Sequence, residues 1–455
     1  MGSVSTVDIT ADPQIGNGGG PGEMPTARFE GFVSIADLES SLLSTYIEST
    51  GEMASLCLDF SESVFIEITS LQHVIALITD RERRGYKTVI KLPKGEDGFK
   101  ARGFLRRWNY PAALKKASGK NFADLVFETD LSYFRGKGGD PGDSPFQGVQ
   151  AIINSPSGPV AITRESFRFF EFTTWDVKAF KEAGRLINDA ADHWDVKPVL
   201  AVLDKHLKKP VPASGKSTAQ SNAGTYVTSR VLFEAMTNAL RHPGARVIQS
   251  SSHMGPTNKR GFSAFTVVFW DDGFSMRETL WRALQEHREI RRSYPLEFDT
   301  SFLFHSVDEH GKRSPPRVVR TSQTPIEKSS DEEFLMAILF PGTTRDIAGT
   351  DNVVAASVMQ DDPRLGQPGM GLFVLINAAV KIFGGAVSFR CDRFFMNVKP
   401  LLWEERHYDA AFRVKIQKYP EALPAFLGNM ITVRLPVTRP TSASESEQPP
   451  KASES

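Results

Sequence analysis

The stretch MASLCLDFSESVFIEITSLQHVIALITDRERRGYKTVIKLP, Met53 to Pro93, carries the clearest fold signal in this chain. Its pattern reads as a strand, a turn, a short strand edge, an amphipathic helix and a second strand, because the apolar period changes from 2 to about 3.6 and back. Gly85 follows a basic last turn, as expected where a helix ends. This order is typical of a βαβ unit. We therefore predict an α/β fold, with a small α/β domain over residues 28–150 that ends in the Gly- and Asp-rich break RGKGGDPGDSP.

Composition narrows the class of protein. The chain has 455 residues, which suggests roughly two or three domain cores. Lys+Arg and Asp+Glu are equal at 54 each, so no overall basic field favours a nucleic-acid partner. Only two cysteines are present, Cys57 and Cys391, which argues against a disulfide scaffold or a zinc finger. With no long apolar run and no secretory signal at the start, we expect a cytoplasmic protein without membrane segments.

The two ends and the middle differ in composition from the rest. Residues 1–27 and 437–455 are rich in small polar residues, Gly and Pro, and we expect both to be disordered tails. Residues 151–221 read as connecting strands and helices. They include GKST at Gly215, the tail of a phosphate-binding loop, but Pro210 stands where that motif requires a glycine, so we read this segment as an ordinary loop.

A helical run, VLFEAMTNALRHPGA from Val231 to Ala245, carries three polar residues four positions apart. On a helix, Glu234, Asn238 and His242 form one stripe beside an apolar stripe. A carboxylate can take a proton from an attacking water, and an amide oxygen can hold Mg²⁺. The alternative is a helix with one exposed polar face.

Two further motifs follow downstream. GFSAFTVVFWDDGFSM reads as a strand that ends at Asp271, where a carboxylate could meet the amino group of a base and Gly273 would let the backbone approach the ring. GQPGMGLFVLINAAVKIFGG then opens with glycines and continues as an apolar helix from Leu372. Backbone N–H groups at such a helix start can meet phosphate oxygens. An ordinary acidic turn and a glycine-rich loop entering a core helix are the alternatives.

In this order, the three motifs resemble the three boxes of the GHKL ATPases, and the first is most similar to that of the anti-sigma-factor serine kinases. The resemblance covers residues 222–436 and implies a C-terminal ATP-binding domain, an α+β sandwich of the Bergerat type. It implies ATP and Mg²⁺ as cofactors, Glu234 as catalytic base, Asn238 as the Mg²⁺ ligand and Asp271, with Gly273, as the adenine contact. The phosphate-side lid and helix start would be Gly369, Met370, Gly371 and Leu372. The segment ITVRLP, Ile431 to Pro436, looks like the family's final strand.

The sequence departs from the family pattern in four places. Ser275 replaces the second glycine of the Asp-x-Gly-x-Gly box, and Gly428-Asn429 stands for a customary Gly-Thr. Long insertions are expected at about 277–360 and 392–427. These departures concern the lid and turnover more than nucleotide binding.

The N-terminal domain faintly resembles the STAS domains of anti-sigma antagonists, with Thr69 near the position of their phosphorylatable serine. The resemblance implies phosphorylation of Thr69 as one hypothesis, and a plain scaffold role for this domain is the alternative. A nucleotide-controlled ATPase switch, in which the nucleotide state moves the lid and reorients this domain, is the leading functional expectation. The alternatives are a serine/threonine kinase of the anti-sigma type and a catalytically inactive nucleotide-binding module. A histidine kinase is disfavoured, because no phospho-acceptor helix hairpin surrounds His73. A protein partner and an ATP-dependent homodimer are further expectations.

Overall fold

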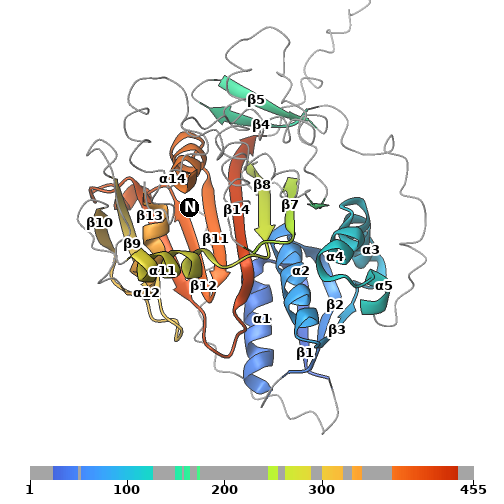
Figure 1. Ribbon diagram of the computed structural model, residues 1–455. Helices are drawn as coiled ribbons and strands as arrows, with labels where there is room; N and C mark the ends of the chain where they lie inside the picture. The colour runs from blue at the N-terminus through green and yellow to red at the C-terminus, as the bar shows by residue number, and fades with distance from the viewer. Residues whose placement is uncertain are drawn as a thin grey trace, which may run out of the picture.

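The computed structural model describes residues 24–49, 53–126, 149–155, 158–163, 172–174, 244–254, 262–287, 300–320, 330–340 and 371–438. Over these residues the protein has a mixed α/β architecture, with helices packed on sheets (Figure 1). None of the helices in these ranges is long and apolar enough to cross a membrane.

The N-terminal part is a parallel three-stranded sheet in the order β1-β2-β3. Its elements alternate strictly along the chain: β1 (Thr26–Val33), α1 (Ile35–Glu48), β2 (Ser55–Ile66), α2 (Ile68–Arg83) and β3 (Lys87–Lys91). The strand–helix–strand order expected from the apolar periods is therefore confirmed as β2, α2 and β3. The turn and separate short strand edge expected before the helix are not found: Ser55–Ile66 is one continuous strand, and its irregularity is limited to register shifts in the pairing with β1. Thr26 and Ala27, which the prediction assigned to the N-terminal tail, belong to β1 and pair with Cys57 and Leu58 of β2.

Three shorter helices complete this part. They are α3 (Gly95–Arg107), α4 (Tyr110–Ser118) and α5 (Phe122–Leu125). Helix α3 lies against β2, and α4 lies against α2. Cys57, on β2, is buried and free, as is Cys391 in the C-terminal part, so neither forms a disulfide.

The second sheet is much larger. Within the described ranges it has 11 strands, nine of them in the order β10-β9-β13-β12-β11-β14-β8-β7-β6, with β4 and β5 branching from β14. Its strands are β4 (Val149–Ser155), β5 (Gly158–Thr163), β6 (Thr173–Thr174), β7 (Ile248–Met254), β8 (Phe262–Asp271), β9 (Ser301–Val307), β10 (Arg317–Arg320), β11 (Ala386–Asp392), β12 (Phe394–Lys399), β13 (Phe412–Lys418) and β14 (Phe426–Thr438). The strands expected in GFSAFTVVFW and ITVRLP are thus confirmed as β8 and β14. Strand β14 continues slightly past the predicted boundary at residue 436.

The two segments expected as insertions meet each other in this sheet. Strands β9 and β10 come from the segment 277–360, and β12 and β13 come from the segment 392–427. Strand β13 pairs in parallel with β9, so the two segments form one continuous extension of the sheet beyond β11 (Figure 1). A short 3₁₀ turn, η7 (Trp403–Glu405), lies between β12 and β13.

Each face of the large sheet packs against a different set of helices. One face carries α11 (Met276–His287), α12 (Asp331–Met336), η5 (Ala337–Leu339) and α14 (Gly371–Ile376), which continues as a π-helical segment, η6 (Asn377–Ile382). Helix α2 of the N-terminal part lies against β14, β8 and β7. Side chains alternate along β8 accordingly: Phe265, Val267 and Phe269 join the first core, whereas Val268 and Trp270 join the core shared with the N-terminal part.

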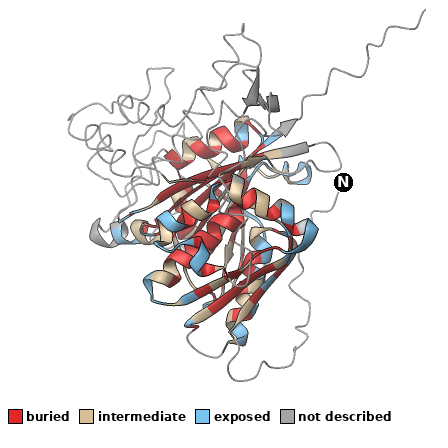
Figure 2. Ribbon diagram, turned by 90° about the vertical axis from the view of Figure 1, so that its right-hand side faces the viewer, coloured by how far each residue is buried: buried red, intermediate tan, exposed pale blue. Residues whose placement is uncertain are grey.

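The described part of the large sheet therefore has a hydrophobic core on each face. Buried residues predominate in its strands and in the helices that pack on it (Figure 2). The N-terminal sheet and its helices are fixed to it through a broad apolar contact. Relative motion of two parts is expected mainly where their interface is small or polar, so this contact favours a rigid junction.

Candidate functional site

Asp271 is the last residue of β8, and the alternation along that strand places its side chain on the face that carries α11 and α14. The residue is 2% exposed. Its carboxylate oxygen Oδ1 accepts a hydrogen bond from the backbone N–H of Gly273 at 3.0 Å, which closes the turn that leaves the strand. The Asp-x-Gly motif thus forms a compact turn with a buried acceptor.

Asn429 lies directly opposite Asp271 on the neighbouring strand β14. Its side-chain Nδ2 donates to both carboxylate oxygens of Asp271, at 3.1 Å and 3.3 Å, and to the carbonyl of Phe274 at 3.0 Å. Its Oδ1 accepts from the backbone N–H of Met276 at 2.6 Å. One buried amide therefore fixes the carboxylate and the whole turn that connects β8 to α11.

Gly428 explains how Asn429 comes so close. It has φ +73°, and a Cβ atom at this position would lie 1.8 Å from the backbone oxygen of Asp271. Only glycine fits such an approach and this backbone conformation. In the sequence, Gly428-Asn429 was only a departure from the family pattern. In the structure, this pair holds Asp271 in place.

Asp272 points away from this turn, toward the N-terminal part. Its carboxylate is fully buried; Oδ1 accepts from the backbone N–H groups of Arg246 at 2.7 Å and Val247 at 2.8 Å, and Oδ2 accepts from the guanidinium of Arg83 on α2. No role for Asp272 was predicted from the sequence. Strand alternation could have suggested that two consecutive aspartates at a strand end face opposite sides.

Helix α14 begins at Gly371, and Leu372 is buried in the same core as Phe269 of β8. The apolar helix expected from Leu372 is confirmed, although its second half is a π-helix. Single π-helical turns inside helices are frequent at functional sites. After this helix, Gly385 approaches β14 so closely that a Cβ would lie 2.3 Å from the carbonyl oxygen of Arg434. Helix and sheet are consequently locked together at this end.

The remaining predicted site residues, Glu234, Asn238, Gly369 and Met370, lie outside the described residues, as does His242. Of the predicted set, the structure describes Asp271, Gly273, Gly371 and Leu372, and it places Asp271 and Leu372 on one face of the sheet. Within the described part of the chain, no cluster of three or more His, Cys, Asp or Glu side chains could hold a metal ion. The predicted Mg²⁺ ligand, Asn238, is not in that part.

Gly244, near the C-terminal end of the first motif, reaches the turn after β8. A Cβ added at Gly244 would lie 3.4 Å from the ring of Phe274, so residue 244 packs on that ring. The guanidinium of Arg282, on α11, covers the same ring at 4.4 Å from its centroid. The first and second motifs are therefore in physical contact through Gly244 and Phe274.

A second polar cluster lies at the junction of the two sheets. Glu39 on α1 accepts from Nε of Arg390 on β11 at 2.6 Å and from the hydroxyl of Tyr419. Nδ1 of His73 lies 3.6 Å from the same carboxylate. The guanidinium of Arg390 also stacks over the rings of Tyr419 and Phe426, at 4.6 Å and 5.2 Å from their centroids.

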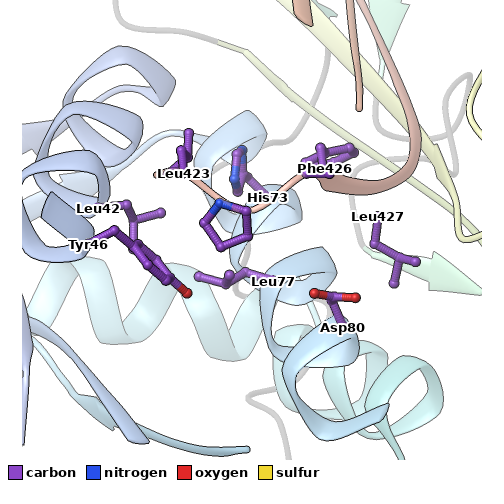
Figure 3. A pocket seen from close by; sticks show the side chains of 10 residues that line it. Leu42, Tyr46, His73, Leu77, Asp80, Leu423, Phe426 and Leu427 are labelled. Atoms are coloured by element: carbon purple, nitrogen blue, oxygen red, sulfur yellow. The ribbon is translucent and has the colours of Figure 1, made fainter. Parts of the chain in front are cut away.

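His73 also borders a small cavity (Figure 3), whose lining includes Leu42, Tyr46, Leu423 and Phe426. The cavity has a volume of about 20 Å³, and a single water needs about 10–15 Å³. It is far too small for a nucleotide. Burial, reinforced by the positive charge of Arg390 and opposed by Glu39, lowers the pKa of His73 to about 4. This cluster therefore has a structural role: it connects α1 of the N-terminal part to β11 of the large sheet.

Thr69, the position that resembles the phosphorylatable serine, is 2% exposed near the start of α2. A kinase could reach its hydroxyl, which is a buried atom, only if the structure around the start of α2 opened.

Comparisons of the chain with models of known protein families, with curated proteins and with solved structures found no match.

Proposed function

We propose that this protein binds Mg²⁺-ATP and hydrolyses it, acting as a nucleotide-controlled switch of the GHKL type. The observation that supports this best is the buried carboxylate of Asp271, held in place by Asn429 at the end of β8 on the sheet face that carries the glycine-led helix α14. A carboxylate fixed before the ligand arrives loses little entropy on binding, as a selective base contact requires.

In this proposal Asp271 accepts a hydrogen bond from the adenine amino group, and Gly273 lets the backbone lie close to the ring. The start of α14, with Gly369 to Leu372, offers backbone N–H groups to the phosphates. Asn238 holds Mg²⁺, and Glu234 takes a proton from the attacking water. Bound Mg²⁺ supplies charge neutralisation at the phosphates.

Hydrolysis is preferred over protein phosphorylation because of the position of Thr69. Thr69, the one candidate acceptor that the sequence suggests, is itself a buried residue of α2, in its first turn. The expected switch also included a reorientation of the N-terminal domain. Because the N-terminal part makes a broad apolar contact with the large sheet, we propose instead that only the lid segment responds to the nucleotide while the N-terminal layer stays in place. We place the protein in the cytoplasm. We also infer a protein partner that recognises the conformation of the lid.

The test uses full-length protein, ATP labelled at the γ-phosphate and two variants. Glu234→Ala should keep ATP affinity within about twofold and lower turnover by about 10²–10⁴, the usual contribution of a general base. Asp271→Asn should weaken ATP binding by about tenfold or more, because a donor replaces an acceptor at the base contact. Asp409→Asn, a surface change, serves as the control.

Three outcomes separate the hypotheses. Free labelled phosphate supports the ATPase, whereas label retained on the protein supports the kinase. ATP binding without turnover in the wild type supports the inactive module. Unchanged ATP affinity in Asp271→Asn would refute the base contact. Light scattering with and without ATP tests for an ATP-dependent homodimer.

A further inference from the structure

Arg83 belongs to the N-terminal part, yet its guanidinium binds a carboxylate that is one residue away from the predicted adenine contact. We propose that Arg83 is a positioning residue of the nucleotide site, through which the N-terminal layer sets nucleotide affinity. This inference rests on the proposed function, and it concerns how the nucleotide affinity of that same site is regulated.

Asp272 lies in a closed environment. Its carboxylate has no exposed surface, and its oxygens accept from Arg83 and from the backbone N–H groups of Arg246 and Val247. Arg83 is the only cationic side chain bound to it among the described residues. A buried charge that loses its partner is strongly destabilised, so the carboxylate would have to move or rearrange if Arg83 were removed.

Asp272 binds the backbone of residues 246 and 247. Residues 246 and 247 belong to the segment that directly follows the helix predicted to carry Glu234 and Asn238. Asp272 also donates its own N–H to the carbonyl of Val247 at 3.3 Å, so the two segments are joined by three hydrogen bonds that involve this one residue. A shift of Asp272 would therefore move residues 246 and 247 relative to the turn that contains Asp271.

Arg83 is positioned by helix α2. It is the last residue of α2, and the preceding turn contains Arg81, which is buried and donates to Thr88 and Tyr46 within the N-terminal part. The position of Arg83 is thus set by the N-terminal fold. Its side chain is 36% exposed, so the contact with Asp272 lies at the edge of the junction, where a local change can break it without opening the core.

The experiment measures ATP affinity, the KM and kcat of hydrolysis, and urea unfolding in full-length variants. Arg83→Met removes the contact. Arg84→Met is the matched charge control, because Arg84 pairs with Asp80 inside the same helix. Gln72→Met is the junction control, because it removes the hydrogen bond of 2.9 Å from Gln72 to Gln249 on β7 without touching Asp272.

We expect Arg83→Met to weaken ATP binding and raise KM by about threefold to thirtyfold, the usual range for coupling through a contact network. Both controls should stay within about twofold of the wild type. Arg83→Lys, which keeps the charge, should recover part of the affinity. In Arg83→Met/Asp272→Asn the loss should equal that of Asp272→Asn alone, because both changes break one contact.

Hydrogen exchange gives a readout that needs no nucleotide. The amides of Arg246 and Val247 should exchange faster in Arg83→Met, and in Arg83→Lys if the methionine variant does not fold. Wild-type affinity in a folded Arg83→Met, or an equal loss in Gln72→Met, overturns the positioning role while the ATPase stands. Absence of ATP binding in the wild type overturns the proposed function itself, and the positioning role with it.

Discussion

Asp271 and Asn429 face each other across β8 and β14, and the amide nitrogen of Asn429 reaches both carboxylate oxygens at 3.1 Å and 3.3 Å. The same side chain also binds the carbonyl of Phe274 and the N–H of Met276. A hydroxyl at this position would have one donor, whereas an amide has two donors and a separate acceptor. The asparagine therefore holds the carboxylate and the following turn at the same time.

Asn429→Ala should lower the free energy of unfolding by about 2–4 kcal/mol, because a buried carboxylate and two backbone groups lose their partner together. ATP affinity should fall in parallel. Urea unfolding and calorimetric titration measure the two effects. Asn397→Ala on β12 is the control, since the side-chain oxygen of Asn397 has no hydrogen-bond partner within the described ranges. Equal losses in both variants would show that Asn429 has no special role.

Gly428→Ala should lower the free energy of unfolding more than Asn429→Ala does, because the added Cβ would lie 1.8 Å from the backbone oxygen of Asp271. Gly311→Ala provides a matched comparison: Gly311 has φ +78°, close to the +73° of Gly428, but open space around it. Gly311→Ala should cost about 1–2 kcal/mol, the cost of backbone strain alone. Gly428→Ala should exceed about 4 kcal/mol or prevent folding. Thermal unfolding of both proteins gives the difference that is due to the close approach, and similar losses would contradict it.

Local patterns in the sequence were sufficient to predict particular elements. The change of period around Ile68 to Arg83 predicted α2 between two strands, and β-branched and aromatic residues predicted β8 and β14. Such patterns encode which side of an element is apolar. They do not encode which other element covers that side, and the docking of α2 on the large sheet was therefore missed. The contact between Gln72 and Gln249 spans 177 residues of sequence, and neither residue carries a local signal of it.

The candidate site shows the same limit. The strand that ends at Asp271 and the apolar helix from Leu372 were predicted from their own motifs, whereas the contribution of Asn429 depends on strand register, which a single sequence does not reveal. The role of Asp272 could not be predicted, because its partner Arg83 lies on the N-terminal part, 189 residues away in the sequence. The predicted residues Glu234, Asn238, Gly369 and Met370 stay predictions, because they lie outside the described residues.

Arg390→Met should destabilise the protein by about 3–5 kcal/mol, because it leaves Glu39 buried without its cation. Replacing both residues, as Glu39→Leu/Arg390→Met, should cost less than the sum of the single changes, since no unpaired charge remains. Urea unfolding of the four proteins completes the cycle. The exposed pair of Arg320 and Asp409 is the control, and breaking it should cost about 0–1 kcal/mol. Additive losses at Glu39 and Arg390 would show that the pair is not coupled.

Acid should weaken the junction between the sheets through two buried histidines. Burial lowers the pKa of both His73 and His253 to about 4, and His253 packs against Phe65, Phe104 and Trp108. An unfolded chain has histidine pKa values near 6.5, so between about pH 6.5 and pH 4 the unfolded state binds more protons than the folded state. Stability must then fall as the pH falls through this window, by on the order of 2 kcal/mol for each histidine.

Urea unfolding of the wild type, His73→Gln and His253→Gln between pH 7 and pH 4.5 separates this effect from the titration of carboxylates, which all three proteins share. Each variant should lose less stability on acidification than the wild type, because the proton uptake on unfolding that drives the loss is removed with the imidazole. His310→Gln, at an exposed turn, should follow the wild-type curve. Parallel curves for all four proteins would mean that neither buried imidazole takes up a proton on unfolding, and acid would then act on the junction only through its carboxylates.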